Sequence, residues 1–394
     1  MNNSSAQPQV DRVQQSITQP DFAIAGAGLL GLLLGWRLAS QGYKVSVYDS
    51  ADEDSPKAAA HTAAAMIAPW AELPVCADGL FEMGCSSLKL WPALLADLEQ
   101  QSAEKIRLGQ GGSLLVAHPA DQSELQDFQA HMQRAGILAD SKDDVQLLSG
   151  SRLRQMEPAL AEHFQQGFWL PNESHLENRR LLALLKQQIR ALGGELHYLA
   201  QVEFVGLSAT VNGTEQPAGR WLDCRGTGAR QSDGRVRGVR GEVVWIEAPD
   251  VYISRPVRLL HPRYHLYLVP KEGGKYILGA TEIESDDRSP VSVRSALEML
   301  SALYALSPGL AEARILEMTA NVRPALPSHK PEIRAIPQGL AINGLFRHGY
   351  LLAPAMLSHL QHEFDLPLGL TGVPQGSESI ALADHKQPSQ EVMA

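Results

Sequence analysis

The stretch DFAIAGAGLLG at residues 21–31 decides the fold. Its apolar start predicts a buried strand over 22–25, and its glycines form the pattern G-x-G-x-x-G at the start of a helix. In that pattern Gly26 permits a tight turn, Gly28 lets the backbone approach a pyrophosphate, and Gly31 lets the helix pack closely on the strand. The N-terminus of such a helix offers free N–H groups and a partial positive charge, so the stretch predicts a site for the phosphates of a dinucleotide.

The residues that follow complete one strand–helix–strand unit. Apolar spacing predicts a helix over 29–41, ended by Gly42, and a strand over 44–49. Asp49 lies 21 residues beyond Gly28, at the end of this strand, where a carboxylate accepts a hydrogen bond from a ribose hydroxyl. A glycine-rich turn without a ligand would leave the three glycines and Asp49 as coincidences. Because a carboxylate repels a 2′-phosphate, the pattern favours FAD or NAD over NADP.

Length and charge restrict the class of protein. A chain of 394 residues is too long for one simple core, so we expect two domains. It contains no apolar run of about 18 residues, so we expect no membrane span. The net charge is −10, without a dense Lys/Arg block, which disfavours nucleic-acid binding and favours a small-molecule substrate.

The cysteines and the N-terminus bear on the cellular setting. Cys76, Cys85 and Cys224 are irregularly spaced and predict neither a disulfide framework nor a metal site. This favours a reducing, cytoplasmic setting. The first 20 residues are rich in Gln, Ser and Asn, which predicts a disordered leader and not a secretory signal.

The remaining chain alternates between helix-like and strand-like segments. We expect helices over 86–103, 120–135, 178–192 and 292–306, and strands within 106–117, around Val202 and Leu222, and over 264–269 and 275–278. An alanine-rich connector runs from Pro56 to Pro69. The alternation predicts an α/β protein with a nucleotide-binding domain built from separated segments and an inserted, strand-rich second domain. The boundaries that we assign are a leader (1–20), a nucleotide-binding domain (21–95, 172–238 and 322–370), a substrate domain (96–171 and 239–321) and a loose tail (371–394).

Several short motifs follow the glycine-rich turn in a defined order. They are HTAAAMIAP at 61–69, Val202, RGE at 240–242, YLVP at 267–270, LGATE at 278–282, NVRP at 321–324 and NGLFRHGYLLAP at 343–354. With this order and spacing, residues 20–365 resemble the glycine oxidase branch of the D-amino-acid oxidase flavoprotein family, which includes the glycine oxidases of thiazole biosynthesis. The chain departs from the family where Ala64 and Ala65 replace common glycines, and where Leu345 replaces a common histidine.

The resemblance implies a fold, a cofactor and a set of site residues. It implies a glutathione-reductase-type FAD-binding domain, a substrate domain on a large mixed sheet, and FAD held without a covalent bond, since no cysteine falls where related sarcosine oxidases attach their flavin. Arg323 matches the arginine that binds the substrate carboxylate, Arg347 its loop neighbour, and Tyr267 the tyrosine of the substrate pocket. The FAD-binding positions that we carry over, together with the turn, are Gly26, Gly28, Leu29, Leu30, Gly31, Asp49, Ser50, His61, Ala64, Ala65, Met66, Val202, Leu345, Phe346, Arg347, His348, Gly349, Tyr350 and Leu351.

The chemistry of these side chains suits the role without the analogy. Arginine suits a carboxylate because its guanidinium is planar, permanently charged and able to donate two parallel hydrogen bonds. Tyrosine adds a hydroxyl donor and a rigid ring that lines the pocket. Structural interpretations remain open: Arg323 before Pro324 also fits a surface turn, Tyr267 fits sheet packing, and residues 346–348 fit a solvated loop. Hydride transfer to a flavin requires no nucleophile, metal or histidine base, so we do not assign His261, His265 or His348 as a catalytic base.

The leading hypothesis is an FAD-dependent oxidase that converts glycine or another small amino acid to the imine. Molecular oxygen would reoxidise the flavin and yield hydrogen peroxide, and the imine would hydrolyse or enter thiazole assembly. A dehydrogenase that passes electrons to a quinone or protein, a tRNA-modifying flavoprotein and a low-turnover assembly partner are the alternatives. The net charge of −10 argues against the tRNA-modifying class. The resemblance is also compatible with a homo-oligomer.

Overall fold

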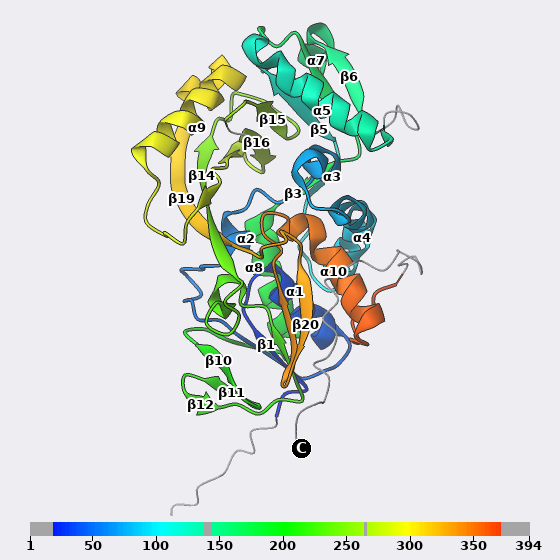
Figure 1. The fold of residues 1–394 in the computed structure, drawn as a ribbon, viewed down its shortest axis with the longest axis vertical. Helices are drawn as coiled ribbons and strands as arrows, with labels where there is room; N and C mark the ends of the chain where they lie inside the picture. Colours follow the sequence, from blue (N-terminus) through cyan, green and yellow to red (C-terminus); the bar gives the residue numbers. More distant parts are fainter. Residues whose placement is uncertain (1–18, 138–143, 264–265, 372–394) are drawn as a thin grey trace, which may run out of the picture.

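The computed structural model describes residues 19–137, 144–263 and 266–371 (Figure 1). The predicted leader and tail therefore fall, apart from 19–20 and 371, outside the described residues. Two sheets organise the described chain, one in the lower half of Figure 1 and one in the upper half. Among the described residues, no helix is long and apolar enough to cross a membrane.

The first sheet has the strand order β20-β21-β13-β1-β2-β9. All neighbours pair in parallel except β20, which pairs antiparallel with β21. The glycine-rich turn follows β1, whose four residues are buried at the centre of the sheet. The bounds are β1 (Phe22–Ala25), β2 (Val45–Tyr48), β9 (Glu195–His197), β13 (Arg220–Asp223), β20 (Glu332–Ile336) and β21 (Gly339–Asn343).

Different layers cover the two faces of this sheet, as a parallel sheet requires. One face packs its apolar side chains, Ile24 among them, against four helices that share a single core cluster. These helices are α1 (Leu29–Ser40), α4 (Leu80–Gln100), α8 (Asn178–Ala191) and α10 (Gly349–Glu363). The other face packs Ala23 and Trp221 against a small three-stranded sheet. Its strands are β10 (Val202–Val205), β11 (Ser208–Val211) and β12 (Thr214–Glu215).

The second sheet is large and mixed, with the strand order β18-β14-β17-β16-β15-β5-β7-β6 and β19 paired on β14. β15 and β5 pair in parallel, and the other pairs are antiparallel. Helices α9 (Val293–Leu306) and α5 (Gln122–Arg134) belong to the core clusters of its two faces. The strands are β5 (Ser113–Ala117), β6 (Gln146–Ser149), β7 (Gln166–Leu170), β14 (Arg237–Glu247), β15 (Val257–Leu260), β16 (Leu266–Lys271), β17 (Lys275–Gly279), β18 (Ile283–Glu284) and β19 (Arg314–Ala325).

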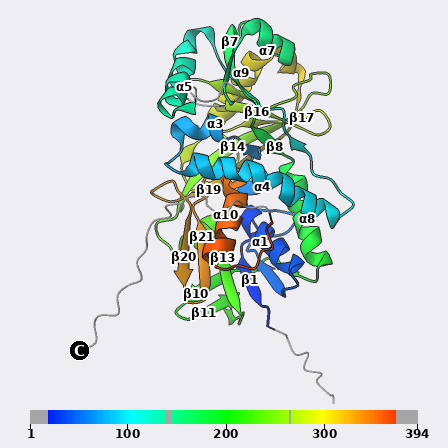
Figure 2. The ribbon, with the colours of Figure 1, turned by 90° about the vertical axis from the view of Figure 1, so that its right-hand side faces the viewer.

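Two long strands and a helix join the sheets. The chain leaves the first sheet after β13, enters β14 and returns through β19 to β20, and the ends of β14 and β19 pair at Arg237 and Ala325. Figure 2 shows α4 lying across the middle of the molecule beside α10. The short elements are α2 (Ala59–Thr62), β3 (Met66–Ile67), α3 (Pro69–Glu72), η1 (Leu73–Val75), β4 (Leu108–Gly109), η2 (Pro119–Asp121), α7 (Gly150–Met156), β8 (Ser174–Leu176), η3 (Gly226–Ala229) and η4 (Pro308–Glu312).

The structure confirms the α/β fold class with its large mixed sheet, and the predicted first strand–helix–strand unit. The helix expected over 86–103 begins earlier, at Leu80. A Cβ at Gly84 would lie 2.9 Å from side-chain atoms of Pro69 and Leu351, so close packing offsets the low helix propensity of this glycine. The strand expected over 264–269 is β16, and residues 264–265 lie outside the described chain. The proposed domain boundaries stay a prediction.

Candidate active site

A cavity of about 930 Å³ runs from the glycine-rich turn of the first sheet to the strands of the second. The sequence-predicted residues that line it come from seven separate segments. They are Gly26, Gly28, Leu29, Leu30, Asp49, Ser50, Ala64, Ala65, Met66, Val202, Tyr267, Arg323, Leu345, Phe346, Arg347, His348, Gly349, Tyr350 and Leu351. Gly31 and His61 are the two predicted positions that the lining does not include.

Each glycine of the turn has a different reason to be glycine. Gly26 has φ +103°, and a Cβ there would lie 2.5 Å from the Cys224 carbonyl oxygen. A Cβ at Gly31 would overlap the carbonyl oxygen of Gly26, so Gly31 serves the packing of α1 behind the turn. At Gly28 a Cβ would meet only the Ala58 side chain, at 3.9 Å. Gly28 thus leaves open space at the N-terminus of α1, which fits the close approach of a phosphate.

Asp49 holds the turn as well as lining the cavity. Its Oδ2 accepts a hydrogen bond from the backbone N–H of Ala27 at 2.7 Å, and its Oδ1 accepts one from Ala51 at 2.8 Å. A carboxylate oxygen has lone pairs for more than one donor, so these bonds leave acceptor capacity for a ribose hydroxyl. Val202 lies nearby, and its carbonyl oxygen accepts from Arg225 Nη1 at 2.8 Å.

His61 faces a second, smaller cavity of about 450 Å³. Burial, with the Arg179 charge, lowers the pKa of its imidazole. Its carbonyl oxygen accepts a hydrogen bond from Asn178 Nδ2 at 3.0 Å. The structure therefore places His61 behind the cavity wall, where it supports the wall from outside.

The loop at 64–66 is held by a buried lysine. Lys271 Nζ donates to the carbonyl oxygens of Ala64, at 2.9 Å, and of Leu176. Burial lowers the pKa of Lys271 to about 8. Ala65 has φ +56°, in the left-handed region that glycine adopts without penalty. This conformation explains why glycine would suit the loop, and the lysine contacts show what holds alanine in it.

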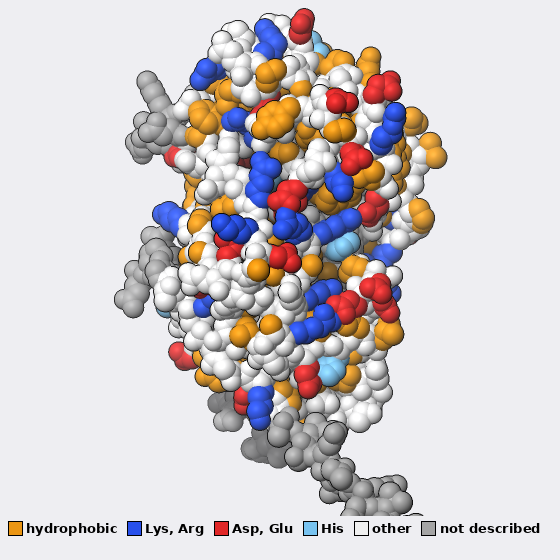
Figure 3. All heavy atoms as spheres, turned by 180° about the vertical axis from the view of Figure 1, so that it is seen from behind, with side chains coloured by type: hydrophobic (Ala, Val, Ile, Leu, Met, Phe, Trp, Pro, Cys, Tyr) orange, Lys and Arg blue, Asp and Glu red, His pale blue; other side chains and the backbone are white. Residues whose placement is uncertain are grey.

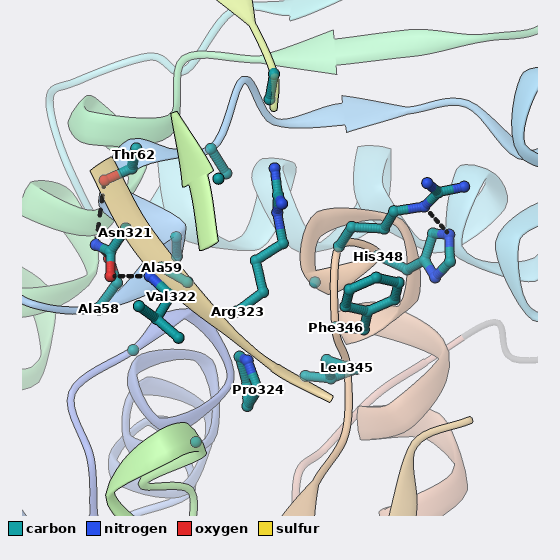
Figure 4. Close-up of a pocket in the computed structure, with 18 of the residues that line it drawn as sticks. Ala58, Ala59, Thr62, Asn321, Val322, Arg323, Pro324, Leu345, Phe346 and His348 are labelled. Atoms are coloured by element: carbon teal, nitrogen blue, oxygen red, sulfur yellow. Dashed lines mark hydrogen bonds between the residues drawn. The ribbon is translucent and has the colours of Figure 1, made fainter. Parts of the chain in front are cut away.

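Arg323 projects from β19 into the centre of the cavity (Figure 4). Its guanidinium occupies the space that a Cβ at Gly241 of β14 would fill. Nη1 donates to the Thr281 carbonyl at 3.1 Å and the Arg240 carbonyl at 3.4 Å, and within the described chain no carboxylate lies at ion-pair distance. Burial lowers its pKa. A buried guanidinium without a counter-charge favours an anionic ligand.

Tyr267 lies on the same side of the cavity as Arg323. It stands opposite Gly279 in the pairing of β16 and β17, and a Cβ at Gly279 would lie 3.0 Å from the tyrosine hydroxyl. Burial raises the pKa of Tyr267, while the charge of Arg323 opposes this rise. Within the described residues the hydroxyl has no hydrogen-bond partner, so it is a free donor and acceptor beside the guanidinium.

Arg347, in contrast, is fully engaged. Its Nη2 lies 2.8 Å from Glu72 Oε2 and its Nη1 2.8 Å from Glu282 Oε2. Glu72 and Glu282 raise its pKa, against its burial. Arg347, carried over as the loop neighbour of the carboxylate-binding Arg323, is therefore part of an ion-pair network with Glu72 and Glu282.

Glu72 is the residue of this site that sequence reasoning missed. Its side chain is 13% exposed and contacts Arg258 Nη1 at 2.7 Å, Arg347 Nη2 at 2.8 Å and His348 Nε2 at 3.2 Å. Burial works against ionisation, yet the two arginines and His348 hold the pKa of Glu72 well below its usual range. A glutamate at the end of α3 carries no sequence signal for this role, because its partners lie on β15 and after β21.

The loop before α10 has a tightly bonded backbone. Phe346 has φ +50°, its N–H donates to the Pro324 carbonyl at 3.0 Å, and the His348 N–H donates to the Leu345 carbonyl at 2.9 Å. The Tyr350 hydroxyl donates to the Ala60 carbonyl at 3.1 Å. The loop therefore delivers the N-terminus of α10 to the cavity as a second source of free N–H groups.

Together these features define a class of protein: a dinucleotide-dependent oxidoreductase with a buried cationic end to its cavity. The geometry fits FAD, since Gly28 leaves room for phosphates and two helix N-termini meet the same cavity. Residues 21–359 match the family described as FAD dependent oxidoreductase, so the chain belongs to this family of FAD-dependent enzymes. Within the described residues, no group of three His, Cys, Asp or Glu side chains is placed to hold a metal ion.

Relatives and solved structures agree with this assignment. A Rhizobium etli protein that carries the name thiamine biosynthesis oxidoreductase ThiO is 35% identical over 336 residues, covering 84% of this chain and 93% of that protein. The glycine oxidase of Bacillus licheniformis is 25% identical over 352 residues, covering 85% and 90%. The crystal structure of glycine oxidase from Geobacillus kaustophilus superposes with a TM-score of 0.76 at 23% identity, covering 90% of this chain and 98% of that one. The resemblance drawn from the motifs is thereby confirmed.

Proposed function

We propose that the protein oxidises glycine or another small amino acid to its imine, with FAD as the acceptor of the hydride from Cα. Water hydrolyses the imine to the oxo acid and ammonia. Molecular oxygen reoxidises the reduced flavin and is itself reduced to hydrogen peroxide. The observation that carries this proposal is Arg323, a half-buried guanidinium that lines the cavity without a counter-charge in the described chain, beside the free hydroxyl of Tyr267. The names of the relatives, glycine oxidase and ThiO, point to the same substrate class.

The residues of the chain bind and orient the substrate. Arg323 receives the carboxylate with a planar fork of N–H donors, and the Tyr267 hydroxyl donates to the same carboxylate. Glu72 and Glu282 pair with Arg347 and Arg258, so Arg323 is left to select the ligand. A site of this kind favours a substrate with one carboxylate, held so that Cα faces the flavin in a space that excludes water.

FAD, when bound, supplies the two-electron acceptor. We propose that residues 26–30 hold its diphosphate, Asp49 its adenosine ribose, Val202 the adenine, and the segments 64–66 and 345–351 the flavin ring. The free N–H groups at the start of α10 would favour negative charge on the reduced ring. We expect no covalent bond: Cys224, which lines the cavity, lies beside Gly26 at the phosphate end, and burial raises the pKa of its thiol.

A role in thiazole biosynthesis belongs to this proposal, on the strength of the ThiO relative. The tRNA-modifying alternative has less support, since on the face shown in Figure 3 Lys and Arg side chains lie interspersed with Asp and Glu and form no basic stripe. Homo-oligomer formation stays a prediction.

The decisive experiment mixes the purified enzyme anaerobically with glycine, sarcosine or D-alanine, follows the flavin absorbance, and then admits air. The proposal expects bleaching with glycine, recovery in air and one peroxide per substrate. Bleaching without recovery would make the protein a dehydrogenase for another acceptor. A flavin that none of the three substrates bleaches would contradict the proposed substrate class.

A further inference from the structure

Arg288 lies in the loop between β18 and α9 and lines the FAD cavity, far in the sequence from the glycine-rich turn. Its Nη1 donates to Asn321 Oδ1 at 2.9 Å and to the Lys57 carbonyl at 3.3 Å. Its Nη2 donates to Thr227 Oγ1 at 3.0 Å. One side chain from the large sheet thus joins three segments that wall the same cavity.

This loop is fixed by a second arginine, so the position of Arg288 does not depend on its own bonds alone. Arg240 forms a buried ion pair with Glu242 at 2.6 Å. Its Nη atoms also donate to three carbonyl oxygens around Arg288, those of residues 287 and 289 at 2.8 Å and of residue 290 at 2.9 Å. The loop backbone is therefore held on both sides of Arg288.

The neighbouring carboxylates are committed elsewhere. Asp286 pairs with Arg230, and Asp287 lies 3.4 Å from Arg240 Nη1. Within the described chain Arg288 itself has no ion pair, and its Nε–H and one Nη2–H have no acceptor. The guanidinium therefore keeps its charge and two donors for a ligand in the cavity.

The wall that Arg288 holds adjoins the phosphate turn. Its partner Asn321, which Figure 4 shows bonded to Thr62, also donates through Nδ2 to the Ala58 carbonyl at 3.1 Å. The Ala58 side chain lies 3.9 Å from the Cβ position of Gly28, at the N-terminus of α1. The first turn of α1 contains no acidic residue. An anion seated there would meet the N–H groups of α1 and would lie next to residues 57–58, which Arg288 and Asn321 hold.

We propose that Arg288 is a further cofactor-holding residue, which clamps the diphosphate of FAD from the loop after β18. A planar guanidinium with free N–H groups is the side chain best suited to a diphosphate. Because Arg288 comes from the large sheet and the turn from the first sheet, bound FAD ties the two together. The proposal concerns the cofactor and is independent of the amino-acid substrate.

The test measures FAD release from the holoenzyme on dilution, by the rise in flavin fluorescence, for wild type, Arg288→Gln, Arg288→Lys and the control Arg314→Gln. Arg314 is an exposed arginine of β19 that donates only to the Glu312 carbonyl among the described residues. Loss of charge-assisted hydrogen bonds predicts that Arg288→Gln weakens FAD binding about tenfold to a hundredfold. Arg288→Lys keeps the charge, so its affinity for FAD is expected to lie between those of wild type and Arg288→Gln. The control Arg314→Gln is expected to bind FAD as tightly as wild type.

Displacement of FAD by ADP and by adenosine separates a phosphate contact from a general loosening of the wall. In Arg288→Gln the affinity for ADP should fall while that for adenosine, which has no phosphate, stays constant. The salt dependence of FAD release should also weaken, since one screened charge is lost. Equal losses for ADP and adenosine, or wild-type FAD release, would overturn the proposal.

Discussion

The two ends of the cavity are built in opposite ways. The phosphate end uses backbone from one continuous segment, in which Gly26, Gly28 and Gly31 shape a turn before a helix. The substrate end uses side chains from β14, β16, β19 and the loop before α10, and its character depends on which charges cancel. Backbone geometry is a local property of the sequence, whereas charge balance is a property of the assembled fold.

Substitutions of two glycines at the phosphate end should have different consequences. Gly31→Ala drives a Cβ into the Gly26 carbonyl and should prevent stable folding of the first sheet, with or without FAD. Gly28→Ala has room in the protein, with the Ala58 side chain at 3.9 Å, and should fold but bind FAD weakly. Circular dichroism and flavin content of the purified variants measure both effects. A Gly28→Ala protein with full flavin content would break the assignment of the turn to the diphosphate.

At the substrate end, Arg323→Met should lower kcat/KM for glycine between about a hundredfold and ten-thousandfold. Two charge-assisted hydrogen bonds of about 1.5–3 kcal/mol each are lost. Arg323→Lys keeps a charge but not the fork and should retain part of the activity. Steady-state kinetics on flavin-loaded protein is the measurement. Unchanged kcat/KM in Arg323→Met would move the carboxylate site elsewhere.

The substitution Glu72→Gln tests whether the ion pairs of Glu72 at the substrate end stabilise the folded protein. Removing one partner of a buried ion pair costs about 3 kcal/mol or more in the free energy of unfolding, since Arg258 loses its ion-pair partner and Arg347 keeps only Glu282. The folded-state pKa of Glu72 is lowered, so its stabilisation is present above the usual glutamate pKa and is lost as the pH falls through the folded value. Urea unfolding should therefore give a large difference in the free energy of unfolding between wild type and Glu72→Gln at pH 7. Near pH 3 this difference should be much smaller. An equal difference at both pH values would contradict this reading.

The smallest effect concerns Glu173, behind the substrate end. It accepts hydrogen bonds from Ser113 Oγ and from the Ala71 N–H, and burial raises its pKa to about 7. Between the usual glutamate pKa and about 7 the folded state binds a proton that the unfolded state has released. Stability is thus expected to fall as the pH rises through this window, by about 2 kcal/mol. Unfolding titrations of wild type and Glu173→Gln at pH 5 and pH 8 check this, and the glutamine variant should lack the drop.

Much of the fold was readable because its signals are local. The strand at 22–25, the helices that begin near Leu29, Asn178 and Ser292, and the strands after Lys275 follow from apolar spacing and glycine breaks. The early start of α4 was not readable, since Gly84 is tolerated only through its packing against Pro69 and Leu351. His61 lies on the far side of the wall of the main cavity and lines the second cavity instead. Its motif predicts where this segment of the chain lies but not the direction in which one side chain points.

The sequence alone determined that a dinucleotide phosphate site opens this chain, since three glycine positions and a strand–helix boundary suffice to shape the backbone. Its motifs also identified the family and brought Arg323 and Tyr267 forward. Only the tertiary structure decided that Arg323 lacks a counter-charge in the described chain, that Glu72 pairs with Arg347 and Arg258, and that Arg288 joins Thr227 to Asn321 in the cavity wall. The physical reason is that Coulomb interactions act through space, between residues that lie far apart in the chain, such as Glu72 and Arg347, which are 275 positions apart.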